Sequence, residues 1–319
     1  MTQSVVETPE LLPPLKEYLE ASQKRFQTCL SPLDEQITID GTQSDVTLHF
    51  VRFDPHTKEP KFSLLAKALA KHVVRFCLSA RSRQRIREKD DFEEDEGELF
   101  LIAREYFRKL KDSGEVGELL LFFLLEAAIG APQVVCKMEL KTNAGDEVKG
   151  ADGIHITWDE KDQHLDVFLG EAKLYQDIGT AMTKALGSIK EFYDKNKLDE
   201  ELHLVTSHFK HLDEEFRRKV TSWVNRETAP EECHIIHSCL IGWDWSQYKR
   251  FATDRDGLFD DFEEEYRKYC KNIRELLSKR FQDYTHKHLS FHFLFVPFDS
   301  VGDFRKAFYR ELLGVDIEQ

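Results

Sequence analysis

Two stretches decide the fold of this chain: Gly150-Ala-Asp-Gly-Ile-His-Ile-Thr-Trp158 and Val167-Phe-Leu-Gly-Glu-Ala-Lys-Leu-Tyr175. Both have the residue pattern of strands, and the polar residues 159–164 between them suit a hairpin turn. A hairpin brings Asp152 close to Glu171, although the two residues are far apart in sequence. The two stretches therefore predict an antiparallel pair of strands that carries two neighbouring carboxylates.

The second stretch places charged residues in an apolar segment. Because alternate residues of a strand point to opposite faces, Glu171 and Lys173 share one face. The apolar residues on the other face are Phe168, Ala172 and Leu174. Two charges in such a segment cost free energy unless a cation, hydrogen bonds or a substrate compensates them.

An aspartate followed on the next strand by Glu-x-Lys resembles the active site of the PD-(D/E)xK nuclease superfamily. Asp152 and Glu171 are hard oxygen ligands for Mg²⁺ or Mn²⁺, and the main-chain carbonyl of Ala172 is a third candidate ligand. The metal would polarise a phosphodiester and lower the pKa of a bound water, while Lys173 would orient that water or offset charge on the phosphate. The alternative is a cross-strand ion pair on a solvated face, because Glu-x-Lys is a common sequence.

Length and composition limit the class of protein. The chain has 319 residues, of which 41% are hydrophobic, and this suits one large or two modest domains with a packed core. Apolar runs are too short to span a membrane, and the first ten residues lack the pattern of a signal peptide. The six cysteines are scattered, as reduced thiols usually are. We therefore expect a cytoplasmic protein without a membrane segment.

The net charge of −14 argues against a chain that coats nucleic acid by itself, since such proteins are usually basic. Cutting DNA therefore needs a local basic track, a metal ion or a partner that delivers the DNA. The run Arg81-Ser-Arg-Gln-Arg-Ile-Arg87 is suited to phosphates or to an acidic partner. The alternative is a solvated connection, which we favour because the acidic run at residues 90–98 competes for the same charges.

That acidic run predicts a boundary between two regions. Residues 1–98 are expected to form an N-terminal α/β region that ends in an exposed acidic linker, and residues 99–319 the main domain. The expected strands are 45–53, 134–140, 150–158, 167–175, 233–243 and 289–298. The expected helices are 15–29, 62–77, 99–110, 114–130, 178–193, 213–225, 257–284 and 301–313, and residues 202–208 suit either an edge strand or a helix. The predicted fold class is α/β (α+β), with a restriction-endonuclease-like core in which helices flank a mixed central sheet.

Two polar residues outside the hairpin are further candidates. Glu118 lies at the start of a helix that is apolar nearly all round, where its alternative role is a favourable interaction with the helix N-terminus. Many PD-(D/E)xK nucleases carry an additional acidic residue on this helix. Lys184 and Ser188 lie four residues apart on one face of the helix after the hairpin. In the superfamily that helix often adds a polar residue to the cleft, so Lys184 is either a cleft residue or an ordinary surface lysine.

The histidines and cysteines do not form a recognisable metal motif. The segment Cys233-His-Ile-Ile-His-Ser-Cys239 lacks a second ligand pair at zinc-finger spacing, and its two cysteines are too far apart for a knuckle. The apolar pattern of this segment instead predicts a buried strand that continues to Trp243. His286, His288 and His292 are expected to be packing or surface residues.

From about residue 45 to the last helix, the sequence resembles the HamA family of the Hachiman anti-phage defence system. The resemblance rests on Gly-Glu-Val-Gly-Glu at 114–118, Gly-Ala-Asp-Gly-Ile-His at 150–155 and Leu-Gly-Glu-Ala-Lys-Leu-Tyr at 169–175. It implies a PD-(D/E)xK-type nuclease effector that acts on DNA and is paired with HamB, a superfamily 2 helicase. Matched residue by residue, it implies catalytic roles for Asp152, Glu171 and Lys173, and less directly for Glu118. Ala151 replaces the proline often found before the aspartate, a position that supplies no catalytic atom.

Two other functions remain open. The chain has no Gly-x-x-x-x-Gly-Lys-Ser/Thr loop, so a separate motor would have to hydrolyse ATP and deliver DNA. One alternative is a non-catalytic interaction subunit that keeps a nuclease fold as a scaffold, and the intact Asp, Glu and Lys argue against it. The other is a stand-alone restriction-type endonuclease, which the acidic net charge makes less favourable.

Overall fold

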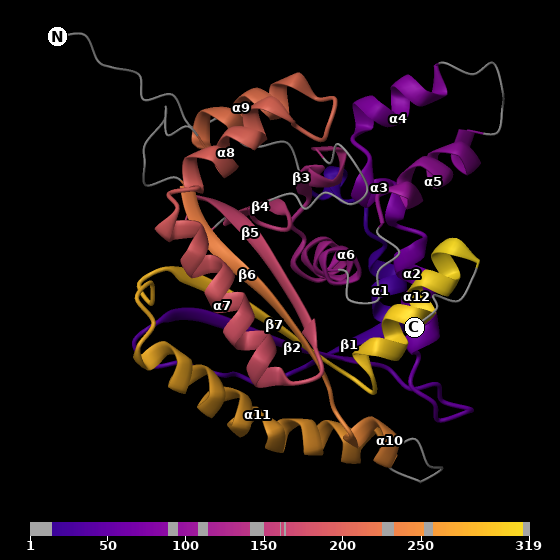
Figure 1. Cartoon of the computed structure of the whole chain (residues 1–319), viewed down its shortest axis with the longest axis vertical. Helices are drawn as coiled ribbons and strands as arrows, with labels where there is room; N and C mark the ends of the chain where they lie inside the picture. The colour runs from indigo at the N-terminus through magenta and orange to yellow at the C-terminus, as the bar shows by residue number, and fades with distance from the viewer. Residues whose placement is uncertain are drawn as a thin grey trace.

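The structure, a computed structural model, describes residues 15–88, 95–107, 114–140, 150–159, 161–162, 164–224, 233–251 and 258–314. Within these ranges, seven strands form one mixed sheet in the order β1-β2-β7-β6-β5-β4-β3 (Figure 1). The strands are β1 Leu30–Leu33, β2 Gln43–Val51, β3 Gln133–Val135, β4 Ile154–Asp159, β5 His164–Tyr175, β6 Cys233–Asp244 and β7 Ser290–Phe298. The predicted mixed central sheet flanked by helices is confirmed.

The predicted hairpin is also present. β4 pairs antiparallel with β5, from Asp159 opposite His164 to Ile154 opposite Leu169. On its other side β5 runs parallel to β6, and β6 runs parallel to β7. Parallel strands lie in the interior of a sheet with helices over both faces, so both sides of each strand are apolar. The segment from Cys233 is accordingly a largely buried strand, as its sequence predicted.

Helices cover both faces of the sheet. In Figure 1, α7 and α11 lie on one side of the sheet, and α6, α2 and α12 lie on the other. The helical segments are η1 Leu15–Tyr18, α1 Gln23–Cys29, α2 Phe62–Ala70, α3 Val73–Cys77, α4 Ala80–Arg87, α5 Asp95–Glu105, α6 Glu115–Leu124, η2 Leu125–Ile129, η3 Lys137–Leu140, α7 Ile178–Asp194, α8 Leu198–Ser207, α9 Glu214–Val224, α10 Gln247–Phe251, α11 Leu258–Gln282 and α12 Val301–Leu313. No helix among them is long and apolar enough to cross a membrane.

Several predicted elements differ from the structure. The helix expected at 15–29 is divided into η1 and α1, and that expected at 62–77 is divided into α2 and α3. The second break lies next to the buried His72, whose Nδ1 is 2.7 Å from the Ala68 carbonyl and whose Nε2 accepts a hydrogen bond from the Ser22 N–H. These contacts join the turn to another segment, a tertiary effect that helix propensity does not contain.

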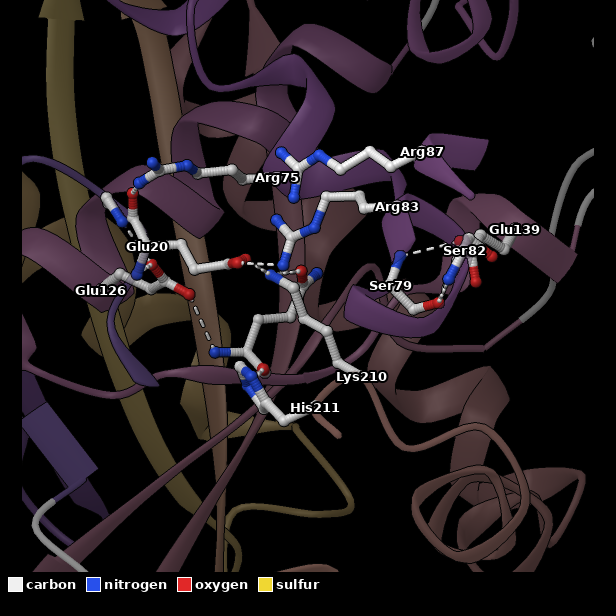
Figure 2. A network of polar contacts seen from close by, with 12 residues as sticks. Glu20, Arg75, Ser79, Ser82, Arg83, Arg87, Glu126, Glu139, Lys210 and His211 are labelled. Atoms are coloured by element: carbon white, nitrogen blue, oxygen red, sulfur yellow. Dashed lines mark hydrogen bonds and ion pairs between the residues drawn. The ribbon is translucent and has the colours of Figure 1, made fainter. Parts of the chain in front are cut away.

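Two further differences concern the segments beside the hairpin. The strand expected at 134–140 ends after three residues and becomes the 3₁₀ helix η3, which turns the Lys137 side chain into the protein interior. Residues 81–87 form the helix α4 rather than a connection. The Ser79 hydroxyl caps this helix by accepting from the Ser82 N–H, and Glu139 of η3 accepts from the Ser79 N–H at 2.7 Å (Figure 2).

The N-terminal strands belong to the same sheet as the hairpin. β2 pairs in parallel with β7, from Gln43 opposite Ser290 to Leu48 opposite Phe295. In the expected acidic linker, residues 90–94 lie outside the described residues, and α5 begins at Asp95. The domain boundary at residue 98 remains a prediction.

A buried polar cluster, the Glu20–Lys210 cluster, joins the N-terminal segment to the sheet (Figure 2). The Glu20 carboxylate lies 2.5 Å from Arg83 and 2.6 Å from the fully buried Lys210. The neighbouring carboxylate of Glu126 accepts hydrogen bonds from the backbone N–H groups of Glu20, Ala21 and Gln133. Both acids in this cluster are thus supplied with donors by the protein itself.

Candidate active site

A cleft of about 330 Å³ opens beside β5, between the start of α6 and the C-terminal half of α7. All four residues predicted to be catalytic line it. Asp152 comes from the segment before β4, Glu171 and Lys173 from β5, and Glu118 from α6. The structure therefore brings together residues from three segments that are separate in sequence.

The backbone holds Asp152 in place. Pairing of the hairpin continues beyond β4, since the Asp152 N–H donates to the Gly170 carbonyl at 2.7 Å and the Gly170 N–H donates to Gly153. The Ala172 N–H then donates to Asp152 Oδ2 at 2.7 Å. In a strand the N–H and C=O of one residue point the same way, so the Ala172 carbonyl is directed to the side of β5 where Asp152 lies.

Two glycines permit this close packing. A Cβ atom at position 170 would lie 2.8 Å from the Leu121 side chain, which is closer than real carbon atoms approach. A Cβ atom at position 117 would lie 3.3 Å from both Ala172 and Leu174. Because both positions are glycine, α6 approaches β5 closely enough to bring half-buried Glu118 to the cleft.

Glu171 is the buried charge of the cleft. It is 7% exposed, its Oε1 lies 2.5 Å from Lys173 Nζ, and Ser188 of α7 also hydrogen-bonds to it. Burial, and then the neighbouring Asp152 carboxylate, raise the pKa of Glu171 to about 7, against the opposing effect of Lys173. The lysine and the hydrogen bonds therefore do not fully compensate the glutamate's charge.

Lys173 stays protonated at neutral pH. Burial alone would lower the pKa of the Lys173 ammonium, but the attraction of Glu171 and Asp152 outweighs it and holds that pKa above its ordinary value. Its side chain keeps 22% of its surface exposed to the cleft. The cleft therefore contains a fixed positive charge beside two carboxylates.

A second buried ion pair supports the segment before β4. Lys137 of η3 donates to the Ala151 carbonyl and forms an ion pair with Glu201 of α8, and both side chains are buried. Gly150, with φ +110°, passes directly over this pair: a Cβ atom there would overlap the Glu201 carboxylate. The pair thus fixes the main chain immediately before Asp152.

Of the two residues that share one face of α7, Ser188 lies at the cleft and Lys184 is the surface lysine of the alternative. Lys184 is exposed and is absent from the cleft lining, whereas Ser188, one turn further along α7, lines the cleft and bonds to Glu171. The i,i+4 spacing indicated the right face of the helix, but not which turn reaches the cleft. Lys137 and His237 also line the cleft. Neither was predicted as a site residue, because each lies in a segment whose apolar pattern predicts a strand.

His237 is a buried neutral neighbour of the site. Its Nε2 lies 2.8 Å from the Tyr193 hydroxyl, and burial lowers the pKa of the imidazole to about 4. It therefore adds no positive charge to the cleft at neutral pH.

Comparison with known families matches the chain to a family described as HamA over residues 27–312. This covers most of the chain and includes every residue of the cleft named above. Curated proteins show no significant similarity to the chain.

Proposed function

We propose that this chain, which belongs to the HamA family, is the metal-dependent deoxyribonuclease subunit of a Hachiman anti-phage defence complex. It hydrolyses phosphodiester bonds of DNA under the control of a partner helicase of the HamB type. Family membership supports the role in defence. The observation that carries the nuclease activity is one cleft that holds Asp152, Glu171 and Lys173, in which the buried glutamate has a charge that the protein does not fully compensate.

The donor groups in the cleft fit Mg²⁺ or Mn²⁺. Asp152, Glu171 and the Ala172 carbonyl would hold the ion, and Glu118 is near enough to line the same space. All four are hard oxygen donors, the type that these ions prefer. A bound ion would polarise the phosphodiester and lower the pKa of a water molecule. Metal binding requires the deprotonated carboxylate. The positive charge of the ion would stabilise the negative charge of Glu171.

The protein's own side chains position and complement this chemistry. The Ala172 N–H fixes Asp152 through Oδ2, and Ser188 orients Glu171. Lys173, which remains protonated, places a positive charge where the phosphate gains negative charge in the transition state. Because these groups are held by strands and a helix, they need little rearrangement when DNA enters the cleft.

The net charge of the chain supports control by a partner. A protein of net charge −14 has few cations to replace the counterions of DNA, so the isolated chain should bind DNA weakly. The helicase would deliver DNA to the cleft or restrain the nuclease until DNA is engaged.

The deciding experiment is a DNA degradation assay with the chain alone and with its co-purified helicase, with and without ATP and Mg²⁺. We expect cleavage that needs Mg²⁺ or Mn²⁺, stops in EDTA and is lost in Glu171→Gln. Undiminished cleavage in excess EDTA would refute the mechanism. Tight, salt-resistant DNA binding by the chain alone would contradict control by delivery, and an intact complex that never cuts DNA would favour the scaffold function.

A further inference from the structure

A second group of ligand-type side chains lies away from the cleft. His164 and Asp166 of β5 and His234 of β6 bring one ring nitrogen each, and one carboxylate oxygen, within 4.8 Å of one another. His164 Nε2 lies 3.0 Å and His234 Nδ1 lies 3.1 Å from the same atom, Asp166 Oδ1. Three side chains therefore converge on one point at the surface of the sheet.

The strand register produces this convergence. His164 and Asp166 are two residues apart and so share one face of β5, and Asp166 pairs directly with His234 on the parallel strand β6. Both elements are strands of the central sheet. A site built from such positions keeps its geometry without a ligand.

The orientation of His234 is set from its far side. Its Nε2 lies 2.6 Å from the Ser290 hydroxyl, which donates in turn to Gln43 Oε1 at 2.9 Å. Since the single hydroxyl hydrogen is given to Gln43, His234 donates through Nε2–H and directs Nδ1 towards Asp166. The 3.1 Å contact between Nδ1 and the carboxylate oxygen needs a positive charge, which a proton on Nδ1 supplies in the metal-free protein and a metal ion would supply in its place.

We propose that His164, Asp166 and His234 bind a transition-metal dication of the zinc class. Two imidazole nitrogens and one carboxylate oxygen are ligands that suit Zn²⁺ and its neighbours in the first row better than Mg²⁺. At metal–ligand distances of about 2.0–2.2 Å, ligand atoms lie roughly 3–3.5 Å apart, close to the observed contacts with Asp166. The relay from His234 through Ser290 to Gln43 is the kind of outer contact that orients a metal-binding histidine.

This site is separate from the nuclease cleft. Asp166 and Glu171 are five residues apart on β5, which is roughly 17 Å along a strand, and they point to opposite faces of the sheet. The His234 side chain is 43% exposed, so an ion enters from solvent and leaves at least one position for water. Bound there, the metal joins β5 to β6 at the end of the sheet where the β4–β5 turn lies, and acts as a structural clamp.

The test measures metal binding by the full-length chain carrying Glu171→Ala, so that the carboxylate cleft contributes as little as possible. The chelator-treated protein is titrated with Co²⁺, read by its visible absorption, and then with Zn²⁺ in competition. We expect one equivalent of tightly held metal and a melting temperature that rises with Zn²⁺. His234→Ala and His164→Ala should lose this binding, and Ser290→Ala should weaken it about 10–100-fold.

The matched control is His56→Ala, which removes an exposed histidine from a loop and should leave binding unchanged. The proposal is overturned if Zn²⁺ binds only at millimolar concentration, or if the His164 and His234 variants bind it as tightly as the control. If either alanine variant fails to fold, Ser290→Ala decides, because it removes only the outer contact: unchanged affinity in that variant would also overturn the site.

Discussion

Glu20 and Glu171 both lie in largely enclosed positions beside a lysine, and their pKa values are shifted in opposite directions. Glu20 contacts Lys210 and Arg83, and although burial raises its pKa, these two cations outweigh burial and bring it to about 2. Glu171 forms an ion pair with Lys173, but burial together with the nearby Asp152 raises its pKa to about 7. The same residue type is therefore stabilised as an anion at one place and destabilised at the other.

The difference distinguishes a structural cluster from a site that needs a ligand. At Glu20 the two cations outweigh burial, so this carboxylate is stable as an anion without a ligand, whereas burial still raises the pKa of the neighbouring Glu126 although it accepts backbone N–H groups. In the cleft, burial and the neighbouring Asp152 outweigh the attraction of Lys173 on Glu171, and a divalent cation would stabilise the charged form of this glutamate.

The largest effect on stability should come from Lys210→Met. This change leaves Glu20 and Glu126 buried without their common lysine, and breaking a buried pair costs about 3–5 kcal/mol of unfolding free energy. The matched variant Lys173→Met should cost less, because Glu171 can take up a proton near neutral pH. Urea denaturation of both variants in EDTA measures the two losses, and equal losses would remove the contrast.

The largest effect on activity should come from the cleft. Glu171→Ala and Lys173→Ala should each lower DNA cleavage by at least about 10²–10³-fold, since each removes a preorganised charge. Both proteins should stay folded and associated with the helicase. Without metal, Glu171→Ala should melt at or above the wild-type temperature, because repulsion with Asp152 is relieved.

The control for those variants is Lys184→Ala. Lys184 is exposed and outside the cleft lining, so cleavage should remain near the wild-type rate. Cleavage and melting are measured on the same samples. A Glu171→Ala protein that is destabilised but still cuts DNA would reject the site.

The pH dependence of stability should have opposite signs at the two glutamates. Without metal, the raised pKa of Glu171 gives a stabilising contribution that is present below pH 4.5 and lost as the pH rises to about 7. Its size is at most about 3 kcal/mol, from 1.36 kcal/mol per pKa unit. The lowered pKa of Glu20 gives a contribution that is present above pH 4.5 and lost as the pH falls to about 2.

Denaturation of wild type and Glu171→Gln in EDTA from pH 5 to pH 8 measures the contribution of Glu171 to the free energy of unfolding. The glutamine cannot ionise, so the wild type should lose stability relative to this variant as the pH rises. A constant difference between the two proteins across this range would show that Glu171 has an ordinary acidity.

The smallest effect on activity should come from the Lys137–Glu201 ion pair, which supports the main chain next to Asp152. The double change Lys137→Met and Glu201→Leu replaces a buried pair by apolar side chains, so stability should change little. Loss of the contact to the Ala151 carbonyl should loosen Asp152 and raise the Mg²⁺ concentration for half-maximal cleavage by about 10–100-fold. The rate at saturating Mg²⁺ should fall less, and an unchanged Mg²⁺ requirement would assign the pair to stability alone.

The elements predicted well are those that local periodicity controls. The alternation around Glu171 placed it on one face of β5 with Lys173, and the structure has both in the cleft. The long apolar pattern of α7 also predicted its helix closely, as Ile178–Asp194. Predictions were poorer where a tertiary contact overrode propensity, as at His72, which breaks a helix, and at Lys137, where a strand pattern becomes η3.

The sequence by itself determined the hairpin and the identity of the cleft candidates Asp152, Glu171 and Lys173, because side-chain direction along a strand depends only on neighbouring residues. Only the tertiary structure decided that Ser188 rather than Lys184 reaches Glu171, and that Lys137 supports Asp152. It also decided the acidities of Glu20 and Glu171, and the meeting of His164 with His234. These properties depend on burial and on distances between segments far apart in the chain, which no local pattern contains.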